Sequence, residues 1–223
     1  MTASRILATL LIAAATAVAQ HQTGPNVDPL RTGVIEFGVS GGYAAGDVGG
    51  ARVDLPGVIT YRVEGRGGPS GKLHVGLGMS SRYQFVAEAA FLAGGRAKAD
   101  LGGGFQVETK TNAIVGAASV HVRFPVTRRF VPYLAIGAGS VQARTDTLVQ
   151  YAAPLRISGT LSDAATQVRL KEGSFASLAG VGAQFFPAKS RIGLRVEAKS
   201  YFPTGSSHTP FVQITVGVFT WLR

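Results

Sequence analysis

Residues 191–202, RIGLRVEAKSYF, alternate between apolar and polar side chains. Successive side chains of a β-strand point to opposite faces. One face of this strand therefore carries the apolar groups Ile192, Leu194, Val196, Ala198 and Phe202. The opposite face carries Arg195, Glu197, Lys199 and Tyr201. The segment predicts a strand with one face against an apolar phase and the other against polar groups.

Seven further segments show the same two-residue period. They are Val34–Tyr43, Lys72–Met79, Tyr83–Leu92, Thr111–Phe124, Phe130 to about Arg144, Phe175–Phe186 and Phe211–Leu222. Short turns follow the second, fourth and sixth strands, at Ser80–Arg82, Pro125–Arg129 and Pro187–Ser190. Longer connections follow the others, at Ala44–Gly71, Gly94–Lys110, Thr145–Ser174 and Pro203–Pro210. We predict an all-β fold, a closed antiparallel up-and-down transmembrane β-barrel of eight strands.

Two of the longer connections contain further alternation. Residues Val58–Glu64 could extend the first hairpin beyond the membrane, or join another short strand to give ten strands. Residues Leu155–Thr160 and Gln167–Lys171 could form a hairpin in the third long connection. We favour protruding extensions over additional barrel strands. A lipocalin-like soluble barrel, with its apolar face inward, is the main rival.

The first residues of the chain have the pattern of an export signal. Met1–Arg5 is a short region with one positive charge, Ile6–Ala15 is apolar, and Ala17-Val18-Ala19 supplies the small residues of a cleavage site. The apolar run is shorter than the roughly 18 residues that a membrane-spanning helix needs. We predict a signal peptide over 1–19, a disordered periplasmic lead-in over 20–33 and the barrel over 34–223.

The composition agrees with an exported membrane barrel. Only 15% of the residues are charged and the mean hydropathy is +0.22, which is unusual for a soluble domain. The absence of cysteine excludes a disulfide framework and thiol or zinc-thiolate chemistry. The net charge of +10 is spread over turns and loops and is not clustered beside aromatic residues. We therefore expect contact with anionic lipid headgroups and no nucleic acid.

Three stretches carry a resemblance to a known family. They are FGVSGGY (residues 37–43), PYLAIGAG (132–139) and GLRVEAK (193–199). Over about Val34–Arg223 the chain resembles the small eight-stranded outer-membrane barrels of the OmpA/OmpX type. The resemblance implies a fold and an outer-membrane location, and it implies no particular activity.

Seven polar residues are predicted to point into the barrel. They are Glu36, Glu88, His121, Arg123, Arg195, Glu197 and Lys199. An eight-stranded barrel is just wide enough for side chains to fill, and buried charges must pair because an unpaired one is very costly. We predict an internal network of salt bridges, in which Glu88 and Glu197 share Arg195, Arg123 or Lys199. A proton or ion relay or a gated pore is the alternative for these residues.

Aromatic residues are predicted to form two girdles at the membrane interfaces. We expect Tyr43, Phe91, Phe202 and Phe211 at the outer rim. We expect Tyr83, Phe85, Phe124, Phe130, Phe186 and Trp221 at the periplasmic rim.

No catalytic, cofactor or metal site is predicted. The four histidines fall on separate elements without metal-ligand spacing. Ser206, Ser207 and His208 lie together in the last long connection, where a lipid A hydrolase would need a serine, a histidine and an orienting acid. Adjacent residues rarely place a histidine nitrogen on the neighbouring hydroxyl, so we interpret them as a polar loop.

These observations predict a non-enzymatic protein of the cell outer membrane with a structural or surface-interaction role. Its expected partners are membrane lipids, including anionic outer-leaflet glycolipid, the outer-membrane assembly machinery and an extracellular ligand of unknown identity. A narrow passive pore is the first alternative, and a lipid A-modifying hydrolase is the second.

Overall fold

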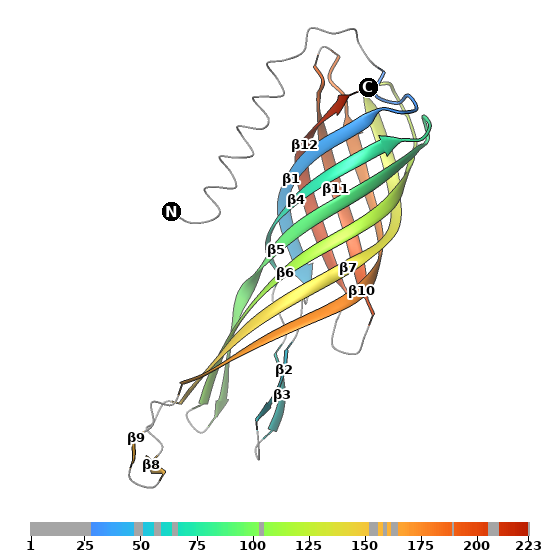
Figure 1. Cartoon of the computed structure of the whole chain (residues 1–223). Coiled ribbons are helices and arrows are strands. Elements are labelled where there is room, and N and C mark those ends of the chain that lie inside the picture. Colours follow the sequence, from blue (N-terminus) through green and yellow to red (C-terminus); the bar gives the residue numbers. More distant parts are fainter. Residues whose placement is uncertain are drawn as a thin grey trace.

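Eight antiparallel strands close into a barrel (Figure 1). The computed structural model describes residues 28–46, 51–55, 59–63, 67–102, 105–151, 156–157, 160–161, 165–188, 190–204 and 210–222. The barrel strands are β1 (Ile35–Gly46), β4 (Gly68–Gly78), β5 (Tyr83–Gly102), β6 (Phe105–Arg123), β7 (Phe130–Tyr151), β10 (Ala165–Phe185), β11 (Ile192–Pro203) and β12 (Phe211–Leu222). Closure comes from β1, which pairs with β4 on one side and β12 on the other. The predicted fold class and the number of eight strands are confirmed.

The two faces of the barrel wall follow the predicted alternation. On β4, for example, Leu73, Val75 and Leu77 are exposed on the outside, whereas Lys72 and His74 are buried inside. An apolar exterior around a polar interior is the pattern of a lipid-facing barrel. The lipocalin-like alternative, with the apolar face inward, is therefore wrong.

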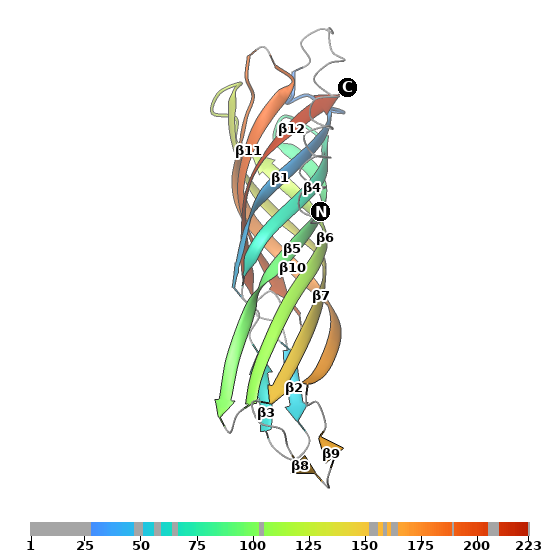
Figure 2. The same ribbon diagram turned by 90° about the vertical axis from the view of Figure 1, so that its left-hand side faces the viewer.

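Four strands continue well beyond the rest of the barrel. The β5–β6 pairing extends to Gly102 and Phe105, and the β7–β10 pairing extends to Gln150 and Ala165. In contrast, β4 pairs with β5 only as far as Leu92. The extended parts of β5, β6, β7 and β10 therefore form an open sheet that projects from one side of the barrel (Figures 1 and 2).

The predicted long loops are partly wrong, because much of their sequence is paired strand. Residues 94–110 lie mostly in the β5–β6 hairpin, and Gln167–Lys171 pairs with β7 and not with 155–160. A strand that lies outside a bilayer needs no aliphatic face. Its alternating positions can therefore hold threonine and charged residues, and the two-residue alternation of hydropathy is lost.

Two short hairpins lie outside the barrel sheet. Strand β2 (Ala51–Leu55) pairs only with β3 (Ile59–Val63), and β8 (Arg156–Ile157) pairs only with β9 (Thr160–Leu161). Of the predicted alternation over Val58–Glu64, the described part Ile59–Val63 therefore lies in a separate hairpin with β2, and the ten-stranded alternative is wrong.

The predicted signal peptide, residues 1–19, lies outside the described residues. Of the predicted lead-in, residues 28–33 are described. They form a turn in which Arg31 N donates to Asp28 O, and Gly33 N donates to Gly78 O of β4. Leu30 packs against a buried apolar cluster inside the barrel that includes Val34, Phe219 and Trp221. Among the described residues, no helix has the length and apolar character needed to cross a membrane.

Candidate functional site

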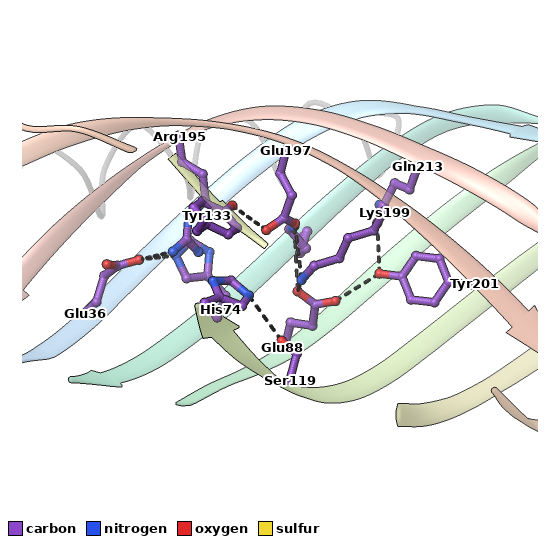
Figure 3. Close-up of polar contacts among 12 residues, drawn as sticks. Glu36, His74, Glu88, Ser119, Tyr133, Arg195, Glu197, Lys199, Tyr201 and Gln213 are labelled. Carbon is purple, nitrogen blue, oxygen red and sulfur yellow. Dashed lines mark hydrogen bonds and ion pairs between the residues drawn. The ribbon is translucent and has the colours of Figure 1, made fainter. Parts of the chain in front are cut away.

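The strand alternation places all seven predicted polar residues inside the barrel. Each is buried, with at most 7% of its surface exposed. They come from β1, β5, β6 and β11. Figure 3 shows Glu36, Glu88, Arg195, Glu197 and Lys199, which are far apart in the sequence, close together in the lumen. The contacts divide into two clusters at different heights.

Glu36 is the centre of the first cluster, which we call the Glu36 cluster. Its Oε1 lies 2.8 Å from Arg195 Nη2 and 2.9 Å from His74 Nε2. Its Oε2 accepts hydrogen bonds from Gln84 Nε2 at 3.0 Å and Gln184 Nε2 at 2.8 Å. The carboxylate thus has one cation and three further polar partners, which compensates its removal from water.

Two carboxylates and two lysines make up the second cluster, which we call the lysine cluster. Lys199 Nζ lies 2.6 Å from Glu88 Oε2 and 3.3 Å from Glu197 Oε1. Lys72 Nζ pairs with Glu197 Oε1 and lies 3.7 Å from Glu88 Oε2. Each carboxylate therefore faces both lysines.

Two tyrosines complete the lysine cluster. Tyr133 Oη donates to Glu197 Oε2 at 2.6 Å, and Tyr201 Oη donates to Glu88 Oε1 at 2.9 Å. The two clusters together place three carboxylates, Glu36, Glu88 and Glu197, against three cations. Charge balance of this kind is what makes a buried ionic cluster tolerable in a low-dielectric interior.

Two of the predicted residues are buried without joining these ion pairs. Arg123 Nη2 donates to the backbone carbonyls of Ser80 and Tyr83, and so fastens a short turn. His121 stacks on Tyr133 with ring centroids 4.5 Å apart, and its Nε2 lies 3.2 Å from Ser119 Oγ. Of the three cations predicted for Glu88 and Glu197, Lys199 contacts both carboxylates, whereas Arg195 forms its ion pair with Glu36.

Lys72 and His74 were missing from the predicted set, although the sequence contained the signal for both. His74 occupies an inward position of β4, and Lys72 lies two residues before it, on the same face. The strand period alone therefore places Lys72 in the lumen.

Glycines on the inner wall make room for the large polar side chains. A Cβ at Gly182 would overlap the Tyr133 ring, and a Cβ at Gly38 would overlap the His74 imidazole. Large side chains of one strand therefore lie over glycines of another strand. This packing explains why glycine recurs in the polar face of the strands.

Apolar layers lie on both sides of the charged clusters. At the end with the short turns, Phe186 and Phe219 pack edge to face, with centroids 5.3 Å apart, beside Val34, Val131 and Trp221. At the other end, Tyr201 stacks on Phe211 at 4.8 Å within a cluster that includes Leu92, Val115, Val141 and Leu178.

Three of the predicted girdle aromatics are in fact part of these layers. Phe186, Phe211 and Trp221 are buried inside the barrel, so their predicted place on the rims is wrong. The strand period gives the reason, since Phe211 and Trp221 share the face of Gln213 and Thr215. The other predicted girdle residues are exposed on the outside, namely Tyr43, Tyr83, Phe85, Phe91, Phe124, Phe130 and Phe202.

Within the described residues, no group of three or more metal-binding side chains occurs. Ser206, Ser207 and His208, which a hydrolase would need, lie outside the described residues.

Charged residues fill the interior of the closed eight-stranded wall, and exposed aliphatic residues cover its exterior. The fold is therefore a closed eight-stranded antiparallel barrel with an apolar exterior and a charged interior. An eight-stranded barrel has an interior just wide enough for side chains to fill.

Solved structures of similar fold include three outer-membrane barrels. Ail, the attachment invasion locus protein of Yersinia pestis, is 16% identical with a TM-score of 0.42 over 86% of this chain and 99% of its own. Neisserial surface protein A is 12% identical with a TM-score of 0.44, over 84% and 95%. The N-terminal β-barrel domain of OprF of Pseudomonas aeruginosa is 10% identical with a TM-score of 0.41, over 86% and 98%.

No family model matches the chain, and no curated protein matches it in sequence. Because these sequence identities and TM-scores are low, the assignment of the architecture rests on the strand pairing of the barrel itself.

Proposed function

We propose that the chain is exported to the cell outer membrane, where the barrel is a rigid, non-enzymatic scaffold with a structural and surface-interaction role. One observation carries this proposal: the charged lumen lies between two apolar layers. The lysine cluster lies against the layer of Tyr201 and Phe211, and the Glu36 cluster lies against the layer of Phe186, Phe219 and Trp221. A filled interior suits a scaffold better than a conduit.

The orientation follows from the lengths of the connections. Outer-membrane barrels have short periplasmic turns and longer external loops. The open sheet of β5, β6, β7 and β10 would then project outward from the cell, with β2–β3 and β8–β9 at the same end (Figure 1). Binding residues are often held on loops and extensions of a rigid scaffold, and this end is the surface that we propose meets lipid and external partners.

The first test is membrane insertion. Refolded into neutral detergent or vesicles, the unboiled protein should migrate faster on a gel than the boiled protein and should show β-rich circular dichroism. A monomer that remains soluble without detergent would contradict the proposal. A deletion strain scored for membrane integrity and for adhesion then tests the structural and interaction roles separately.

The two alternatives have their own assays. Planar-bilayer recording of the pure protein should show no steady conductance, because both apolar layers interrupt a water path. A conductance that vanishes on Arg195→Met would instead support a narrow pore. Mass spectrometry of lipid A after overexpression should show no change, whereas loss of an acyl chain would support the hydrolase.

A further inference from the structure

A shallow groove of about 540 Å³ lies on the outside of the wall, where β6, β7 and β10 leave the barrel to form the open sheet. The edge of the groove nearer the barrel is apolar. There, Phe91 and Ile114 are 47% and 57% exposed on the outside of the wall. Phe175, also exposed, lies two residues after Gly173 on β10. This apolar edge therefore continues the apolar outer surface of the barrel.

The edge of the groove nearer the open sheet is basic. Strand pairing places Asn112 opposite Arg144, and Arg144 opposite Lys171, so that one amide and two cations form a row across three strands. Like charges directly opposite each other on neighbouring strands are destabilising. An anion bound between Arg144 and Lys171 would remove this repulsion.

Asp146 is a carboxylate partner of Arg144, but its contact with Arg144 is longer than its contact with Arg169. Asp146 Oδ1 lies 2.8 Å from Arg169 Nε and 3.8 Å from Arg144 Nε. The shorter contact is a hydrogen bond, in which Arg169 Nε donates to Asp146 Oδ1. The side chain of Arg144 is 46% exposed, so its guanidinium is accessible to a ligand as well as to Asp146.

The floor of the groove is open and carries hydrogen-bond donors. A Cβ built on Gly173 would meet no atom within 4 Å. The amide of Gln142 lines the same groove as the guanidinium of Arg144 and the ammonium of Lys171. These donors suit phosphate oxygens, with which charged donors form strong hydrogen bonds.

We propose that this groove binds the phosphorylated headgroup of an outer-leaflet lipid, with Arg144 and Lys171 on the phosphate. The acyl chains would run down the wall along Ile114 and Phe175. The inference rests on the proposed function for the orientation of the barrel. We choose a lipid as the ligand because the cations Arg144 and Lys171 lie next to the exposed apolar side chains of the groove. A free anion would not contact those apolar side chains.

The test compares two double variants that lose the same charge. Arg144→Gln with Lys171→Gln alters the groove. Lys98→Gln with Lys110→Gln alters exposed cations farther out on the same face of the open sheet. Each refolded protein, in neutral detergent, is titrated with bis-phosphorylated lipid A, with dephosphorylated lipid A and with inorganic phosphate, and bound ligand is measured by native mass spectrometry.

We expect the groove variant to bind phosphorylated lipid A at least about tenfold more weakly than the unaltered protein, and the control variant to stay within about twofold. Equal weakening in both variants would show diffuse attraction and overturn the site. Equal affinity for dephosphorylated lipid A would also overturn it, as would saturation by inorganic phosphate alone. Heat-modifiable migration reports the barrel separately: its absence in the unaltered protein contradicts the proposed function, whereas a folded barrel without selective binding overturns only the site.

Discussion

Lys72 of β4 and Glu197 of β11 form an ion pair across the barrel lumen, although 125 positions separate them in the chain. Their strands are not neighbours, because β1 and β12 lie between them in the wall. Both side chains are only 1% exposed. The pair therefore connects two strands that are not neighbours in the wall through the interior, which backbone pairing cannot do.

Replacing Lys72 with Met should destabilise the barrel strongly. Glu88 and Glu197 would then face Lys199 alone, and breaking a buried ion pair in this way costs about 3–5 kcal/mol. Urea unfolding in vesicles measures the loss, and the double variant Lys72→Met, Glu197→Gln should recover part of it. Lys98→Met is the matched control, since Lys98 is exposed. A loss below about 1 kcal/mol, as for a surface pair, would show that the lumen is wet.

Gly182→Ala should also destabilise the barrel, because the new methyl group would overlap the Tyr133 ring. Overpacking of this kind costs about 1–3 kcal/mol. Displacement of Tyr133 should change the NMR shifts of the stacked His121 ring. The control is Gly173→Ala on the same strand, where the methyl group meets open space. Equal stability of the two variants would contradict the packing of Tyr133 over Gly182.

Val196→Lys should impair insertion, because Val196 is 50% exposed on the outward face of β11. A lysine at the middle of the lipid-facing surface costs about 2–4 kcal/mol. The yield of heat-modifiable barrel in vesicles measures the effect. Val126→Lys, in a short turn, should leave the yield unchanged. Normal insertion of Val196→Lys would mean that this face does not contact lipid.

Asp146 should titrate at an unusually low pH. The hydrogen bond from Arg169 lowers the pKa of this exposed carboxyl, with Arg144 adding to the effect. A pKa below the unfolded value of about 3.9 means that the contribution to stability is present above that pH and is lost as the pH falls through the folded pKa. NMR titration of the carboxyl carbon should show this, and Arg169→Gln should raise the midpoint. An unchanged midpoint in that variant would exclude the Arg169 contact.

Sequence periodicity anticipated the barrel wall because it is a local property. The face of Arg195, Glu197 and Lys199 follows from their spacing alone, whatever the rest of the chain does. The same rule applied to Lys72, Phe211 and Trp221 would have placed them inside as well. The inward position of these three residues is therefore also a local property of the sequence.

The extended ends of β5, β6, β7 and β10 show where the local signal stops. Beyond the membrane these strands alternate threonine with charged residues, as in Thr109, Lys110 and Thr111, so the hydropathy pattern resembles that of a loop. Their continuation as strands depends on hydrogen bonds to neighbouring strands. Those bonds are properties of the assembled sheet.

By itself, the sequence determined which side chains face the lipid and which face the lumen, since a period of two depends only on neighbouring residues. Only the tertiary structure decided which charges meet. Closure of β1 between β4 and β12 sets the register of the strands and the heights of their inward residues. That register brings Arg195 to Glu36 and gives Glu197 to Lys72 and Lys199. Ion pairing across a lumen depends on the relative positions of distant strands, which no local pattern encodes.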